Sequence, residues 1–186
     1  MENTAPVLVV DGDPRALGAV SKALFDAGYK VLEAATALDA FCQAKKNHPD
    51  LILLNVDLPD EDGIALCKRI KSDPGLRDCA VALLSAGSAA EEPAHVFEAN
   101  ADEYITCPLS DRELVLRVRA MARTKRVQDD LHERVKELNC LYSISAVVDG
   151  PDISLDEILQ SIVDLLPAAW QYPEIAVARI RLDQDE

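Results

Sequence analysis

A chain of 186 residues, 49% of them hydrophobic, is long enough for one ordinary domain with its own core and a smaller appendage. Its formal net charge of -14 disfavours binding to the nucleic-acid backbone or to anionic membranes, because both attract basic surfaces. The chain opens without the basic region of a signal peptide, and no stretch approaches the roughly 20 apolar residues of a membrane span. We therefore expect a cytoplasmic protein that binds neither nucleic acid nor membrane.

Apolar runs that suit strands alternate with amphipathic stretches of helical period through the first part of the chain. The expected strands are 6–11, 30–35, 50–55, 79–86 and 102–106. The first expected helix begins near Pro14, three more cover 37–48, 64–73 and 92–101, and a long helix begins at about Ser110. Strict alternation implies a parallel sheet with right-handed crossovers and helices on both faces. The strands are too continuously apolar for a one-sided antiparallel sheet. We predict a doubly wound α/β domain over residues 5–123.

A set of mostly polar residues follows the ends of these strands, where ligands bind in doubly wound sheets. They are Asp11, Gly12 and Asp13 after the first strand, Asn55 and Asp57 after the third, Ser85 after the fourth, and Thr106 and Cys107 after the fifth. Carboxylates, an amide and a hydroxyl together are polar enough to form a site. Asp and Asn at such positions also cap helices and shape turns, so position alone leaves both interpretations open.

Several stretches of this domain resemble the receiver domain of two-component response regulators. They are VLVVDGDP (7–14), DAGYKVLEAA (26–35), PDLILLNVDLPDEDG (49–63), LCKRIKSDP (66–74), LLSA (83–86) and NADEYITCPLSDRELVLRVRAM (100–121). The resemblance implies a flavodoxin-like sheet of order 2-1-3-4-5. It also implies a site in which an acidic pair holds Mg²⁺ and an Asp takes a phosphoryl group from a histidine kinase. A Ser or Thr contacts that group, a Lys neutralises it, and an aromatic residue acts as a switch.

The resemblance assigns these roles residue by residue and reveals three departures. The matching residues are Asp11 at the first acidic position, Ser85 at the hydroxyl position and Tyr104 at the switch position. The departures are Gly12 at the second acidic position, Asn55 at the acceptor position, and Cys107, directly before Pro108, at the lysine position.

These departures bear directly on the phosphoryl chemistry. An acyl phosphate forms by attack of an anionic carboxylate oxygen, which the neutral amide of Asn55 does not offer. Mg²⁺ prefers hard oxygen ligands in octahedral array, so the loss of carboxylates at positions 12 and 55 leaves at most a weak site at Asp11. Cys107 brings no positive charge to the phosphoryl group. We expect a degenerate pseudo-receiver with no catalytic residue and no cofactor, in which the Asn55 amide donates a hydrogen bond to Asp11.

Two alternatives stay open. The residual acidic residues Asp11, Asp13 and Asp57 allow a receiver that is phosphorylated on Asp57 or Asp13 instead. The chain could also be the N-terminal regulatory part of a sensor histidine kinase, with the catalytic region beyond residue 186. The chain itself is not expected to be an enzyme, and the expected partner is a histidine kinase or another signalling protein.

Apolar residues continue past the expected end of the domain. Leu131, Val135, Leu138 and Tyr142 are spaced four, three and four residues apart, with charged residues around them. This spacing predicts a helical, coiled-coil linker over residues 124–149 through which the chain forms a homodimer. A single amphipathic helix that lies on its own domain is the alternative.

The last segment, residues 150–186, shows a helical pattern over 155–170 and an alternating, strand-like pattern over 173–183. The strings RVKELNCLYSIS and DGPDISLDEILQSIVDLLPAAWQYPEIAVARIRL resemble the entry into a GAF-type sensor domain of sensor histidine kinases. One helix and one strand are too little for such a core. We therefore expect an N-terminal fragment of a GAF-like domain, and a chain that is part of a longer signalling protein.

Overall fold

The computed structural model describes residues 6–86, 99–148, 154–169 and 176–180. Its strands are β1 (Val7–Val10), β2 (Val31–Ala34), β3 (Leu51–Asn55), β4 (Ala80–Ser85) and β5 (Glu103–Thr106). Its helices are α1 (Pro14–Asp26), α2 (Ala37–Asn47), α3 (Gly63–Ser72), α5 (Asp111–Val148) and α6 (Leu155–Leu165), followed by the short 3₁₀ helix η1 (Leu166–Ala169). The chain divides into two compact units, Met1–Lys125 and Arg126–Glu186, and α5 contributes residues to both.

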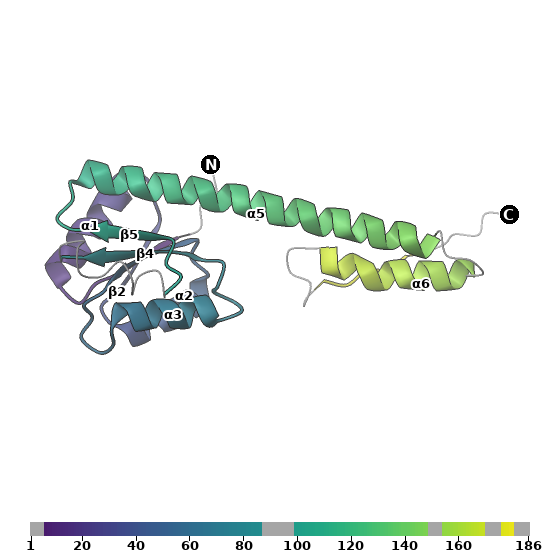
Figure 1. Ribbon diagram of the computed structural model, residues 1–186, viewed down its shortest axis with the longest axis horizontal. Coiled ribbons are helices and arrows are strands. Elements are labelled where there is room, and N and C mark those ends of the chain that lie inside the picture. Colours follow the sequence, from purple (N-terminus) through teal and green to yellow (C-terminus); the bar gives the residue numbers. More distant parts are fainter. Residues whose placement is uncertain (1–5, 87–98, 149–153, 170–175, 181–186) are drawn as a thin grey trace. The chain divides into compact units, whose positions relative to one another are not determined.

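The five strands form one parallel sheet in the order β2-β1-β3-β4-β5, which confirms the predicted doubly wound topology (Figure 1). The central strand β3 lies between β1 and β4, and the side chains from Leu51 to Leu54 are at most 1% exposed. A strand that is covered on both faces needs apolar residues at every position, which is why this run shows no alternation.

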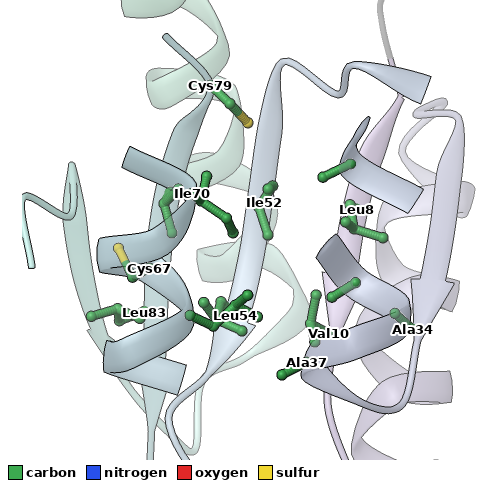
Figure 2. Packing of buried hydrophobic residues seen from close by; sticks show 14 of the residues in the cluster. Leu8, Val10, Ala34, Ala37, Ile52, Leu54, Cys67, Ile70, Cys79 and Leu83 are labelled. Carbon is green, nitrogen blue, oxygen red and sulfur yellow. The ribbon is translucent and has the colours of Figure 1, made fainter. Parts of the chain in front are cut away.

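Each face of the sheet has its own hydrophobic cluster, because successive strand side chains point to opposite sides. Leu8, Val10, Ile52 and Leu54 lie in one cluster, and Val7, Val9, Leu51 and Leu53 lie in the other. Helices α2 and α3 cover the first cluster with residues such as Ala37, Cys67 and Ile70 (Figure 2). Helices α1 and α5 cover the second with Leu24, Leu114 and Val118. Each fully buried Leu or Ile contributes about 1.5–3 kcal/mol to folding.

Beyond the sheet, the predicted elements are confirmed in part. The long helix begins at Asp111, close to the expected Ser110, and α6 with η1 covers most of the predicted helix over 155–170. The helix predicted over 92–101 lies mostly outside the described residues. The strand predicted over 173–183 is wrong for the part that is described, since residues 176–180 form neither helix nor strand. A strand is held by ladder hydrogen bonds to a neighbour, and no described segment pairs with these residues.

One further observation concerns membranes. Within the described ranges, none of the helices combines the length and the hydrophobicity needed to cross a bilayer.

Candidate functional site

The site lies at the carboxyl edge of the sheet, where the ends of four strands meet. The register pairs Val10 of β1 with Leu54 of β3, so Asp11 and Asn55 follow on adjacent strands at the same level. Ser85 at the end of β4 pairs with Thr106 at the end of β5. The backbone N–H of Cys107 continues this pairing by donating to the carbonyl oxygen of Ser85 at 2.7 Å.

The centre of the site is a hydrogen bond between Asn55 and Asp11. Asn55 Nδ2 donates to Asp11 Oδ2 at 2.9 Å, and the backbone N–H of Asp13 donates to Asp11 Oδ1 at 2.8 Å. The Asp11 side chain belongs to a residue that is only 5% exposed. A buried carboxylate is costly unless donors satisfy it, and here each of its oxygens accepts a hydrogen bond from a neutral donor.

The other end of the Asn55 amide is also engaged. Asn55 Oδ1 accepts a hydrogen bond from the backbone N–H of Asp57 at 3.0 Å, which is the geometry of an Asx turn. An N–H group requires an acceptor and a carboxylate requires a donor, so the two neighbours of the amide fix which end is oxygen and which is nitrogen. An aspartate at this position would offer acceptors to both neighbours and would face Asp11 with a second negative charge.

The two other carboxylates of the predicted acidic pocket lie at its margin. Asp13 is exposed and caps α1, since its Oδ1 accepts from the backbone N–H of Arg15 at 2.9 Å. Asp57 is exposed in the turn after β3, where its backbone forms an isolated antiparallel bridge with Asp62. The structure therefore brings Asp11 and Asn55 together and leaves Asp13 and Asp57 as turn and cap residues.

Pro59 packs against Gly12 and leaves no room for a side chain there. A Cβ atom on Gly12 would lie 2.9 Å from Pro59 Cδ, a distance that real Cβ contacts do not show, so any side chain there requires Pro59 to shift. Gly63 is packed more tightly still. A Cβ atom on Gly63 would overlap the carbonyl oxygen of Asn55 and would lie 2.8 Å from Val56 Cα. Gly63 thus allows the start of α3 to pack directly against the backbone that carries Asn55.

Cys107, at the position where the resemblance leads us to expect a lysine, directly follows β5. It is half-buried beside the cluster under α1 and α5, and its peptide bond to Pro108 is cis. Burial, together with the nearby Asp11 carboxylate, raises the pKa of the Cys107 thiol above its ordinary value. The side chain is therefore a neutral thiol at neutral pH and brings no positive charge to the site.

The residues at the two predicted switch positions lie on neighbouring strands, Ser85 at the end of β4 and Tyr104 within β5. Ser85 is 4% exposed at the end of β4. Tyr104 on β5 is partly buried and packs against the hydrophobic cluster that α2 and α3 cover.

Asp60, which sequence reasoning missed, ties the loop after β3 to a neighbouring helix. Its Oδ1 accepts from the backbone N–H of Ala37 at 2.8 Å and its Oδ2 from that of Leu38 at 3.1 Å, at the N-terminus of α2. The bond from Ala37 is the main reason that the pKa of Asp60 is lowered. The first N–H groups of a helix have no acceptor within the helix, so a capping acceptor is expected at every helix start. The sequence does not show that the cap comes from a residue so far along the chain.

These residues do not fit Mg²⁺ in the manner expected of a receiver. Both oxygens of Asp11 accept hydrogen bonds from neutral donors, Gly12 has no side chain, and the Asn55 amide presents its nitrogen to Asp11. Throughout the described ranges, no group of three or more His, Cys, Asp or Glu side chains is arranged to hold a metal ion.

Comparison with known proteins assigns the fold to a family. The model of the response regulator receiver domain matches residues 7–119. The DNA-binding dual master transcriptional regulator RpaA of Synechocystis is 35% identical over 117 residues, which cover 63% of this chain and 48% of that protein. Response regulator PleD of Caulobacter vibrioides is 33% identical over 153 residues, which cover 79% of this chain and 33% of PleD. The match thus spans a third to about half of the length of these two relatives.

A solved structure agrees with the sequence matches. The crystal structure of a putative response regulator from Chloroflexus aurantiacus superposes with a TM-score of 0.62 at 33% identity, covering 65% of this chain and 99% of that one. The parallel sheet of order 2-1-3-4-5, the polar residues at its carboxyl edge and these matches lead to one assignment: the chain belongs to the response regulator receiver domain family.

Proposed function

We propose that residues 7–119 form a pseudo-receiver of two-component signalling, which accepts no phosphoryl group and acts through contacts with a histidine kinase or another signalling protein. The observation that carries this proposal is the hydrogen bond from Asn55 Nδ2 to Asp11 Oδ2 at 2.9 Å. This bond places a neutral amide donor between the two strand ends. Phosphoryl transfer to a receiver requires an anionic nucleophile and a cation instead.

The nucleophile is the first element that the site lacks. A carboxylate oxygen attacks the phosphorus atom as an anion, whereas the Asn55 amide is neutral and both of its ends already take part in hydrogen bonds. Positive charge that would stabilise the transferred group is the second element that the site lacks. Phosphoryl transfer depends on electrostatic stabilisation of the transferred group, and Cys107 supplies a neutral thiol in place of a cation. Weak or absent Mg²⁺ binding follows from the engaged oxygens of Asp11.

Phosphorylation on another carboxylate has less support. Asp13 is the N-cap of α1, and Asp57 is exposed in the turn, so neither occupies the position of Asn55 beside the buried Asp11. A phosphoryl group on either would be carried by an exposed side chain.

The proposal extends to the rest of the chain. Helix α6 begins with a capping box, in which the side chains of Ser154 and Glu157 each accept a hydrogen bond from the other residue's backbone N–H. We retain the GAF-like assignment of residues 150–186 and a cytoplasmic location as parts of the proposal.

The proposal is tested by incubating the chain with acetyl phosphate and Mg²⁺ and measuring the intact mass. No phosphoryl adduct is expected on the wild type or on the Asn55→Asp variant alone, since the latter still lacks an acidic residue at position 12 and a lysine at position 107. A receiver that has the acidic pair, the acceptor Asp and the Lys serves as the positive control for the labelling reaction.

A stoichiometric adduct on the wild-type chain would overturn the proposal. Its loss in Asp13→Asn or in Asp57→Asn would then identify the residue that replaces the usual acceptor, and the chain would be an active receiver.

A further inference from the structure

The described part of the chain after Lys125 carries many apolar side chains but no core. None of the residues in 126–148, 154–167 and 176–180 is buried. Among the described residues, all but three of the exposed large hydrophobic side chains lie in this part; those three are Phe25, Leu38 and Leu116. Exposed apolar surface gathered in one region marks an interaction site more often than a free surface.

Four exposed apolar side chains of α5 form one stripe. Leu131, Val135, Leu138 and Tyr142 are 61%, 45%, 54% and 74% exposed, and no described segment covers them. Their spacing of four, three and four residues places them on one side of the helix, as in the a and d positions of a heptad. With Leu131 and Leu138 at d, Val135 and Tyr142 fall at a.

The carboxylates of residues 127–142 lie away from the stripe. These four carboxylates belong to Asp129, Asp130, Glu133 and Glu137, which occupy the outer b, c and f positions of the same heptads. Glu133 also pairs along the helix with Lys136 at 3.0 Å. The positions that flank the stripe hold Val127, His132, Arg134, Asn139 and Leu141 and contain no carboxylate. In a chain of net charge -14, this face is free of the repulsion that another copy would otherwise meet.

These observations distinguish among the classes of partner. Nucleic acid and anionic membranes require a basic surface, and Arg134 is the only formally charged residue among the flanking positions named above. A second copy, by contrast, matches the stripe residue for residue. A β-branched residue at a with Leu at d favours two parallel strands, because Val135 then packs on Val135 and Leu138 on Leu138.

We infer that the stripe of Leu131, Val135, Leu138 and Tyr142 is the seam of a two-stranded, parallel, in-register coiled coil between two copies of this chain. The inference goes beyond the proposed pseudo-receiver and does not depend on the chemistry of its pocket. At a rise of about 1.5 Å per residue, the seam from Leu131 to Tyr142 is only about 17 Å long. The dimer is therefore expected to depend on concentration.

The test uses the full chain in sedimentation equilibrium over a wide range of concentration. The wild type is expected to shift from monomer to dimer as concentration rises. Leu138→Asp is expected to weaken association at least tenfold, because it places two carboxylates opposite each other in the seam. The matched control is Glu137→Ala at the neighbouring outer position, which is expected to change association less than threefold. Circular dichroism of each variant verifies that the helix is retained.

The orientation is tested by Leu131→Cys in a chain whose exposed Cys42 and partly buried Cys107 and Cys140 are replaced by serine. An in-register parallel pair brings the two introduced thiols together, so oxidation should give a covalent dimer that is absent from the Leu131→Cys, Leu138→Asp double variant. A wild type that stays monomeric at every concentration, or a dimer that survives Leu138→Asp unchanged, would overturn the inference. A dimer that forms no disulfide through position 131 would overturn the parallel arrangement.

Discussion

The Asn55→Asp variant is the sharpest probe of the hydrogen bond at the centre of the site. The substitution replaces the donor by a carboxylate at the same place, 2.9 Å from Asp11 Oδ2. At an effective dielectric constant of about 20, two full charges at that separation repel by roughly 6 kcal/mol. The pair avoids this cost by keeping one proton between its two carboxylates.

The free-energy cost of keeping that proton determines how much stability the Asn55→Asp variant loses. A carboxylic acid ordinarily loses its proton near pH 4, so holding it at pH 7 costs about 4 kcal/mol, at about 1.4 kcal/mol per pH unit. We therefore expect the variant to be less stable than the wild type by about 3–4 kcal/mol at pH 7. In this range the folded variant binds one proton more than the unfolded chain. Its stability relative to the wild type should therefore rise by up to about 1.4 kcal/mol for each unit that the pH falls toward 5.

The measurement is urea unfolding of the wild type, Asn55→Asp and Asn55→Ala at pH 5, 6 and 7. Asn55→Ala serves as the control, because it removes the donor without adding a charge and should cost about 1–3 kcal/mol with little dependence on pH. If Asn55→Asp is as stable as the wild type at pH 7, or if its deficit is the same at all three pH values, the amide does not hold Asp11 as described.

Three other predictions concern the packing and the helix cap of the domain. Gly63→Ala should destabilise the fold by about 3 kcal/mol or more, because its Cβ would overlap the backbone of Asn55, whereas Gly18→Ala, with nothing within 4 Å, should be neutral or stabilising in the same unfolding assay. Asp60→Asn should remove a pH-dependent contribution to stability. Because the pKa of Asp60 is lowered in the folded state, this contribution is present above the unfolded-state pKa near 4 and is lost as the pH falls through the folded-state pKa. The unfolding midpoints of the wild type and the variant should therefore converge at low pH. Cys79, whose pKa burial raises to about 12, should react with a thiol reagent only on unfolding, while the exposed Cys42 reacts in the folded protein; equal rates for the two would contradict the described packing.

The fold could be predicted from the sequence because its information is local. The run from Leu51 to Leu54 is apolar at every position, which requires cover on both faces, and alternation with helical stretches then fixes a parallel sheet. The hydrogen bond between Asn55 and Asp11 could also be expected. Both residues stand at strand ends, and the carboxyl ends of adjacent parallel strands meet at one edge.

Other features depend on tertiary contacts that no local pattern reports. The cap that Asp60 gives to α2 joins residues that are 23 positions apart, and the acidic run around it contains several equally suitable carboxylates. Asp13 could be read as a pocket residue or as a helix cap, and only the path of the backbone decides for the cap. The alternation over 173–183 predicted a strand, which the described residues 176–180 do not form, because a strand exists only where a partner completes its hydrogen bonds.

The central claim is that the Asn55 amide satisfies the Asp11 carboxylate by a hydrogen bond, in place of the metal ion that an intact receiver site would bind. Nuclear magnetic resonance of the side-chain NH₂ group of Asn55 tests this claim most directly. The two signals, assigned by their absence in Asn55→Ala, should include one proton that exchanges slowly with solvent because it is bonded to the buried Asp11 carboxylate. Millimolar Mg²⁺ should leave both signals unchanged. Rapid exchange of both protons, together with a saturable shift on addition of Mg²⁺, would show that the carboxylate is open to a metal ion and would contradict the account.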